Sequence, residues 1–344
     1  MSEHLAMYGL ANDPYEAPRL KSYVPSANMR PPVEVQSFGA IRSAKLKQLF
    51  ADCRNPSNPD DPKKPAYVLI RGRNGVGRTE VARQILWQYK EVAGAEKIVV
   101  PFFKSHHDPS ELVKTWLLKI EPVVREYDAN KEIAPLINTV LDAQIIKGAV
   151  RRAFNELLQR IDDKFSNRKP KPFVLGFCLD DSLPGFPHSE LAEIFSEGNL
   201  VVVSVVDTSD DTAPEIYREM ERDGRAWILP TSELTADDAF LLAEHCWKRE
   251  RAADERSPVG LPDIKKIWSD EKLWARLLPL QPPLPLAHML LVLSKALSDK
   301  GLLEKESGLQ WPNPKLNITG NDLYRICWNS AETLRRGRWD QQAS

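Results

Sequence analysis

The sequence predicts a parallel α/β domain followed by a small all-helical domain. Short apolar runs alternate with helical patterns until about residue 231, and no strand-like run follows. Uniformly apolar strands separated by helices are typical of a parallel sheet that is covered on both faces, so we expect three layers. We expect an extended N-terminal arm over residues 1–40, the α/β domain over 41–231, and the helical domain with a C-terminal tail over 232–344.

The elements follow from the spacing of apolar residues and from the residues that begin or end a helix. Asp108 and Pro109 are suited to start a helix as N-cap and first residue, and Thr235 with Asp238 forms a capping box. The prolines of residues 54–65 predict a loop. Strands are expected at 66–72, 97–103, 173–181, 200–207 and 225–230, and helices at 40–53, 79–90, 108–120, 235–252, 261–278, 286–303 and 319–336, with helical pattern also dominating to about 166.

Composition and charge favour an ordinary globular protein. The 344 residues carry a net charge of -1, so contact with nucleic acid or acidic membranes would need a local patch. The four cysteines are scattered and lack the spacing of zinc ligands. The N-terminus has no signal-peptide pattern, and no apolar run is long enough to span a bilayer. We therefore expect a cytoplasmic location and no membrane contact.

A glycine-rich stretch between an expected strand and an expected helix predicts a phosphate-binding loop. "GRNGVGRT" fits the pattern G-x-x-x-x-G-K-T with arginine in place of the lysine; in such loops backbone amides surround phosphate oxygens and the helix N-terminus adds partial positive charge. The Thr79 hydroxyl is a candidate Mg²⁺ ligand. The alternative is a glycine-rich turn that binds nothing. The candidate nucleotide-binding residues of this loop are Gly72, Asn74, Gly75, Val76, Gly77, Arg78 and Thr79.

Arg78 occupies the position where such loops normally carry lysine. Arginine keeps the charge and can pair with two phosphate oxygens, but its guanidinium is planar and bulkier than an ammonium group. The substitution therefore favours nucleotide binding over fast hydrolysis.

An acidic pair ends the strand expected at 173–181. In parallel sheets ligands bind at the carboxyl ends of strands, so Asp180 is a candidate metal ligand. Asp181 stands where a second acid would orient the attacking water. The alternative is a solvated turn, since aspartate is common after strands.

The loop "GRNGVGRT" and the pair "LDD" give the chain a resemblance to P-loop NTPases of the ASCE division, which holds the AAA+ and STAND proteins. The resemblance covers roughly residues 40–300 and implies ATP or ADP with Mg²⁺ as ligands. It also implies a sheet in which the strands, numbered along the chain, lie in the order 5-1-4-3-2, with the helical domain acting as a lid.

The resemblance implies further site residues. Asp207 or Thr208 would be the polar sensor of the terminal phosphate, and a polar strand exit is the alternative. Pro285 would pack near adenine, or would simply start a helix. An arginine finger acts on the nucleotide of a neighbouring subunit, and a solvated helix face is the alternative for each candidate. The candidates for this catalytic role are Arg218, Arg222 and Arg225.

The leading functional hypothesis is an ATP-binding switch of the AAA+/STAND kind with slow or absent hydrolysis. It would control assembly with itself, as a homo-oligomer, or with a separate effector protein. A second hypothesis is a DNA-associated AAA+ helper of the transposition or origin-loading kind. A third is a non-enzymatic scaffold that keeps a degenerate P-loop fold.

Overall fold

The computed structural model places most of the secondary structure that the sequence predicts. It describes residues 3–15, 66–72, 78–92, 94–104, 108–128, 131–142, 147–165, 170–182, 186–194, 200–207, 215–223, 226–230, 236–251, 256–259, 261–268, 270, 286–308 and 316–329. The helix expected at 40–53 lies outside these residues.

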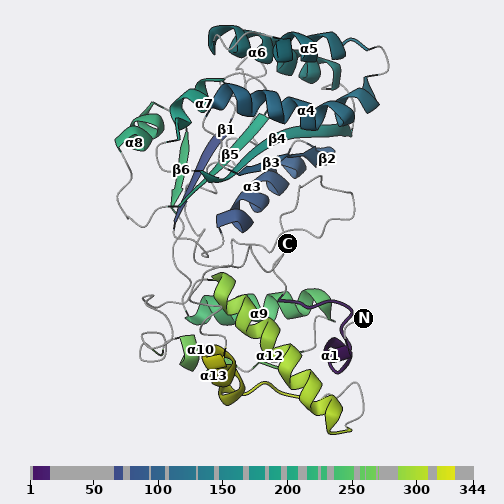
Figure 1. Cartoon of the computed structure of the whole chain (residues 1–344), viewed down its shortest axis with the longest axis vertical. Coiled ribbons are helices and arrows are strands. Elements are labelled where there is room, and N and C mark those ends of the chain that lie inside the picture. Colours follow the sequence, from purple (N-terminus) through teal and green to yellow (C-terminus); the bar gives the residue numbers. More distant parts are fainter. Residues whose placement is uncertain are drawn as a thin grey trace.

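A parallel sheet forms the centre of the α/β domain (Figure 1). Its strands lie in the order β2-β4-β5-β1-β6, and every described pairing is parallel. This order confirms the predicted 5-1-4-3-2 arrangement. The bounds are β1 Ala66–Gly72, β2 Ala95–Val99, β3 Phe102–Lys104, β4 Lys171–Ser182, β5 Leu200–Asp207 and β6 Trp227–Pro230.

The strand expected at 97–103 is divided in two. β2 and β3 both pair with β4, and Val100 and Pro101 separate them. Proline has no backbone N–H to donate to a sheet ladder, so the pairing is interrupted at Pro101. The carbonyl of Pro101 still accepts from the backbone N–H of Cys178 at 3.4 Å. The strand therefore continues along β4 after a short break.

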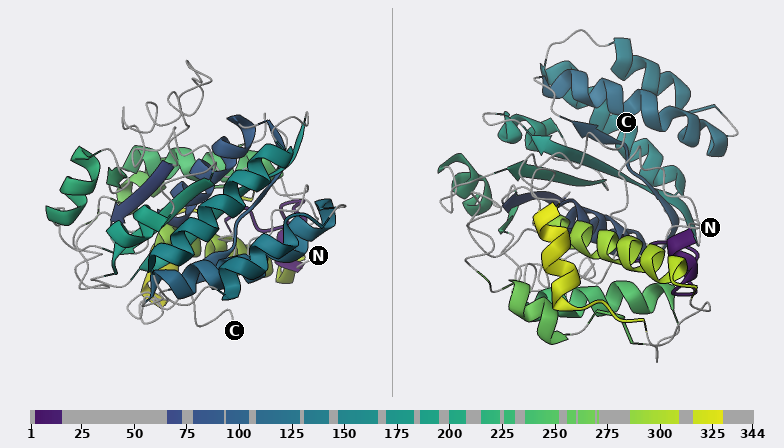
Figure 2. Two further views of the ribbon diagram at one scale, coloured as in Figure 1. Left: turned by 90° about the horizontal axis from the view of Figure 1, so that it is seen from above. Right: turned by 60° about the horizontal axis from the view of Figure 1, so that its bottom comes forward.

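Helices cover both faces of the sheet. α3 (Arg78–Val92) lies on one face, while α4 (Pro109–Tyr127), α7 (His188–Ile194) and α8 (Glu215–Arg222) lie on the other (Figures 1 and 2). Alternate residues of β1 enter the two cores: Val68 and Ile70 pack with α3, and Tyr67 and Leu69 pack on the opposite side. The continuous apolar run in β1 is thus buried on both faces.

A helical hairpin adds a further layer outside α4. α5 (Ala134–Asp142) and α6 (Lys147–Phe165) pack together and extend the core on the side of α4 that faces away from the sheet (Figure 1). The buried carboxylate of Asp128 ties these helices together, because it accepts the Ile133 N–H at 2.8 Å and pairs with Lys164 Nζ at 2.5 Å. Burial opposes its ionisation, but Lys164 and the backbone donors outweigh burial and lower the Asp128 pKa.

Among the described residues, the second unit is helical apart from an isolated bridge between Val259 and Ile318, and it also contains the start of the chain. Its helices are α9 (Ala236–Glu250), α10 (Leu261–Trp268), α12 (Leu286–Glu306) and α13 (Gly320–Asn329). The one-turn helix α1 (Glu3–Ala6) packs against α12, beside which it lies in Figure 2. Within the described residues no helix is long and apolar enough to cross a membrane.

Gly176 of β4 allows α3 to lie close to the sheet. An added Cβ at this position would be 2.7 Å from Val100 Cγ2 and 3.0 Å from Leu86 Cδ2. On the other side, Trp116 Nε1 of α4 donates to the Gly176 carbonyl at 2.9 Å. The strand is therefore fixed between two helices with no room for a side chain toward α3.

We predict that Gly176→Ala lowers the free energy of unfolding by about 1–3 kcal/mol, because Val100 is fully buried and stiff and must shift to admit the methyl group. Thermal or urea unfolding measures the effect. The control is Asn138→Ala on the exposed side of α5, which should leave stability almost unchanged. A Gly176→Ala protein as stable as the parent would mean that α3 is not packed this closely.

Candidate functional site

The candidate phosphate-binding loop connects β1 to α3. β1 ends at Gly72 and α3 begins at Arg78, so the predicted strand-loop-helix context is present. The first backbone N–H groups of a helix have no partner within the helix, and they carry its partial positive charge. The other loop residues of the prediction, Asn74, Gly75, Val76 and Gly77, lie outside the described residues, as does the side chain of Thr79.

Strand register brings the predicted polar positions to one edge of the sheet. Gly72 pairs with Asp207 across β1 and β5. β4 lies next to β5, and Asp180 pairs with Lys104 of β3. Because all these strands are parallel, their carboxyl ends meet at the edge from which the β1–α3 loop leaves.

β4 is irregular where its acidic pair occurs. Leu179 pairs with Ser204, but Ser182 pairs with Val206, so β4 has one extra residue at Asp180 and Asp181. Such bulges change the direction of successive side chains and are common next to binding sites. The structure places the backbone of both aspartates and does not describe their side chains. The described residues contain no group of His, Cys, Asp and Glu arranged to hold a metal.

Two buried arginines flank the loop. Arg71 precedes Gly72 in β1, and Arg78 is the first residue of α3; both side chains are only 6% exposed. Arg71 also lies near Tyr217 of α8, where its charge partly offsets the rise in the tyrosine pKa caused by burial. The sequence analysis missed Arg71, although a lone arginine inside the apolar run "AYVLIRG" was a usable signal.

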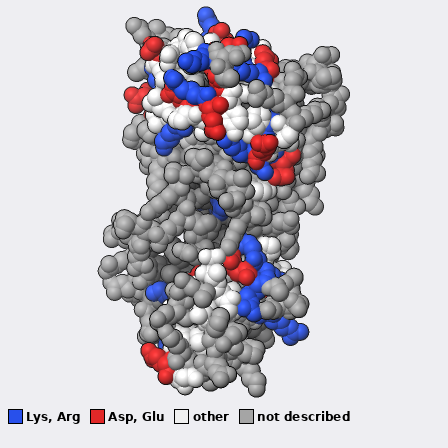
Figure 3. Space-filling view, turned by 90° about the vertical axis from the view of Figure 1, so that its right-hand side faces the viewer, with Lys and Arg blue, Asp and Glu red and all other residues white. Residues whose placement is uncertain are grey.

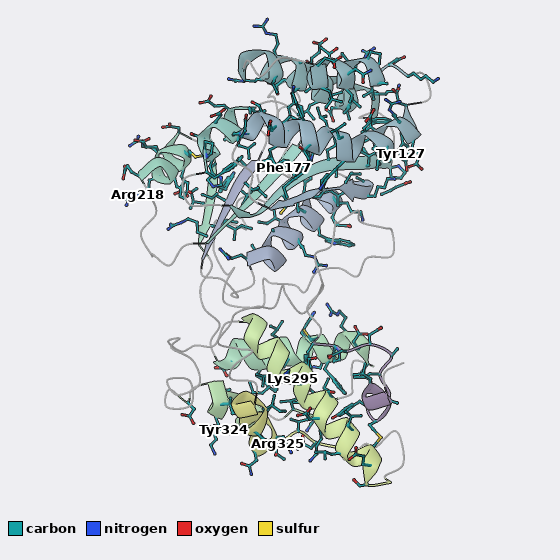
Figure 4. The ribbon with its side chains drawn as sticks, in the orientation of Figure 1. Tyr127, Phe177, Arg218, Lys295, Tyr324 and Arg325 are labelled. Carbon is teal, nitrogen blue, oxygen red and sulfur yellow. The ribbon has the colours of Figure 1, made fainter. Side chains whose placement is uncertain are left out.

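The candidate arginine fingers do not all share one environment. Arg218 and Arg222 lie on α8 with exposed side chains, and their ion-pair partners are the local residues Glu215 at 3.5 Å and Asp223 at 3.8 Å. Figure 4 shows Arg218 at the periphery of the α/β domain. Arg225 and Pro285 lie outside the described residues, and α12 begins directly after Pro285.

A buried histidine links β1 to the helices beside it. His188, the first residue of α7, is 1% exposed, and its Nδ1 lies 2.9 Å from the Tyr67 hydroxyl. Its ring makes edge contacts with Phe186 at 4.8 Å and with Tyr217 at 5.5 Å between centroids. Its Nε2 is buried without a hydrogen-bond partner among the described residues. The aromatic cluster joins β1, the strand that precedes the loop, to α7 and α8.

Comparison with family models and with curated proteins finds no match to the sequence. Solved structures give matches at low identity. The Aeropyrum pernix ORC2 protein in its ADP form has a TM-score of 0.51 and 12% identity, over 93% of this chain and 73% of that one. Weaker likenesses are to the A. pernix ORC1 protein in complex with DNA and to a chain of the E. coli MS115-1 HORMA:CdnC:Trip13 complex. The ORC1 match has a TM-score of 0.43 and 15% identity, over 84% of this chain and 65% of that one. The match to the E. coli chain has a TM-score of 0.44 and 12% identity, over 90% of this chain and 94% of that one.

The chain shares the fold of the A. pernix ORC2 protein. At this level of identity the likeness extends to the arrangement of strands and helices and not to the activity of any neighbour.

Acid should destabilise the protein through His188. Burial lowers the pKa of His188 to about 4 from 6.5, so between these values the unfolded chain binds a proton that the folded chain does not. The contribution of neutral His188 to the free energy of unfolding is complete above pH 6.5. It is lost as the pH falls toward 4, and the total loss is on the order of 3 kcal/mol.

Urea unfolding between pH 4 and 7 tests this prediction through its pH slope. His188→Phe should flatten the slope in this range even if it changes stability at neutral pH, because phenylalanine cannot titrate. Asn138→Ala, at an exposed and non-titrating position of α5, should keep the slope. An unchanged slope in His188→Phe would show that another group takes up the proton.

Proposed function

We propose that this chain is a nucleotide-binding switch of the AAA+/STAND kind, which holds ATP or ADP with Mg²⁺ and hydrolyses ATP slowly or not at all. The observation that carries the proposal is the buried guanidinium of Arg78 at the first position of α3, directly after the loop. A permanently charged group in this place is suited to phosphate oxygens.

The sheet edge supplies the other parts. Backbone amides of Gly72, Asn74, Gly75, Val76 and Gly77 would surround the phosphates. Thr79 and Asp180 would hold Mg²⁺, Asp181 would orient water, Asp207 would sense the terminal phosphate, and Pro285 would lie near adenine. The register that aligns Gly72, Asp207 and Asp180 along one edge supports this assignment.

Slow turnover follows from the chemistry of the substituted positions. The arginine fork is less able than a lysine to follow the terminal phosphoryl group as its bond breaks. Aspartate at position 181 is also shorter than glutamate, so the attacking water is held less closely. The site would then hold nucleotide without rapid turnover, which suits a ligand whose binding selects between conformations of the protein.

The helical unit would act as a lid, and nucleotide between the two units would favour assembly with other copies of the chain or with an effector protein. The exposed Arg218 and Arg222 suit a contact with a neighbouring subunit. On the face of the α/β domain shown in Figure 3, the described basic and acidic side chains are interspersed, an arrangement that favours a protein partner over DNA.

We predict that Arg78→Ala weakens nucleotide binding at least tenfold, equivalent to about 1.4 kcal/mol, because the variant loses a buried charge next to the phosphates. Titration with a fluorescent ATP analogue measures the affinity. Arg83→Ala is the control, since Arg83 is also buried on α3 but lies beyond its first turn. Mass spectrometry of the denatured wild type should detect ADP or ATP. A wild type that neither carries nor binds nucleotide would favour the scaffold hypothesis.

Arg78→Lys should raise steady-state ATP hydrolysis about tenfold, because a compact ammonium on a flexible stem can follow the terminal phosphate. Turnover should still be slow, since Asp181 is unchanged. Phosphate release by the wild type and the variant over a concentration series is the measurement, and a rate per subunit that rises with concentration would indicate an arginine acting between subunits. A wild type that hydrolyses ATP faster than Arg78→Lys would show that the arginine is adapted to catalysis.

A further inference from the structure

The first residues of the chain pack against α9, α10, α12 and α13 of the helical unit, and the surface that they cover is here called the groove. This N-terminal segment, residues 3–15, contributes five side chains to the core formed by α9, α10, α12 and α13. All five are less than 7% exposed, and they come from Leu5, Met7, Tyr8, Leu10 and Tyr15. The segment therefore completes a core whose other members lie more than 220 residues further along the chain.

The local fold of the segment suits a compact ligand. α1 has one turn, and Gly9 follows it with a φ of 67°, a left-handed conformation that glycine adopts without strain. The Gly9 N–H donates to Ala6 O at 3.0 Å, and the Leu10 N–H donates to Leu5 O at 3.1 Å. This is a Schellman ending, and it brings Leu5 and Leu10 to the same core.

Polar contacts fix the segment in one register. Ser294 Oγ of α12 donates to Asp13 Oδ2 at 2.5 Å, and the other carboxylate oxygen of Asp13 accepts the Tyr15 N–H at 2.8 Å. The Tyr15 hydroxyl lies 3.0 Å from Ser257 Oγ.

Tyr8 makes two further polar contacts with the helical unit. Its hydroxyl donates to Leu297 O at 3.3 Å, and Arg251 Nη1 donates to Tyr8 O at 2.6 Å. The groove thus recognises both the apolar side chains and the backbone of the segment.

The contacts described above join the segment to the helical unit, so they do not require its covalent connection to the α/β domain. A helix of one turn is not stable by itself, so the groove orders the segment. Fifty residues, 16–65, separate it from β1. A chain of this length can reach up to about 170 Å when fully extended, which is enough to reach another molecule.

We propose that the groove is a peptide-binding site that accepts the N-terminal segment of a second copy as well as that of its own chain. Exchange of the segment links copies through their helical units. Within one chain the covalent connection gives the segment an effective concentration that does not depend on dilution, so at low protein concentration its own groove is filled first. Exchange between copies therefore increases with protein concentration.

The test uses the full chain with a protease recognition sequence inserted within residues 54–65, cleaved after folding. We expect the cleaved N-terminal piece to co-elute with the remainder, and a fluorescent peptide of residues 1–16 to replace it. The peptide should bind the uncleaved chain at least tenfold more weakly, because the tethered segment competes. In mixtures of two differently tagged, uncleaved copies, co-purification should increase with concentration and decrease when both carry Leu10→Ala.

Peptide variants separate recognition from non-specific binding. Leu10→Ala removes a buried anchor, and Gly9→Ala strains the left-handed turn, so each should weaken binding at least tenfold. Asn12→Ala, at an exposed position, should bind like the parent peptide. Unfolding of the helical unit on cleavage, a cleaved protein that never exchanges its segment, or binding that ignores Leu10 and Gly9 would overturn the proposal.

Discussion

The parallel pairing of β1 with β5 on one side and β6 on the other is the constraint on which the candidate site depends. It buries β1 on both faces and fixes the direction of every neighbouring strand. The loop after β1 must then leave the sheet at the same edge as the ends of β4 and β5. The strands that meet at this edge come from distant parts of the chain, so the residues of the candidate site need not be neighbours in sequence.

The packing under β1 adds a second constraint. Gly176 keeps α3, which begins with Arg78, close to one face of the sheet. On the other face, Arg71 and the Tyr67–His188 contact join β1 to α7 and α8. A buried arginine lies at each end of the loop. Tyr217 of α8 contacts His188, which in turn contacts Tyr67 of β1, so a movement of α8 would displace groups that pack against β1.

The helical unit is assembled from two distant parts of the chain. Its core contains the N-terminal segment, whose residues precede the α/β domain, as well as residues of α9, α10, α12 and α13, which follow it. The chain therefore passes between the two units in both directions. Nucleotide bound at the sheet edge and a peptide bound in the groove would act on connected parts of one molecule, because each unit is joined to the other by two stretches of chain.

The sequence by itself determined the order and type of the elements. The apolar runs, the Asp108 cap and the glycine-rich loop are local signals, and the structure confirms most of the strands and helices that they predict where it describes them. The helix expected at 261–278 is wrong in its end, because α10 stops at Trp268 and Asp270 is not helical. The observed sheet order also matches the order that the family resemblance implies. That resemblance rested on the spacing of a loop and an acidic pair along the chain. The roles of individual site residues stay predictions, since they depend on a ligand and on loop residues outside the described ranges.

Only the tertiary structure decided which distant residues are buried together. The break at Pro101, the burial of Arg71 and His188, and the bulge at Asp180 and Asp181 depend on what packs against each strand. The start of the chain was predicted as an extended arm, whereas residues 3–15 fill the core of the helical unit. Hydrophobic periodicity shows that a side chain will be buried, but burial is non-directional, and so the pattern alone does not select its partner.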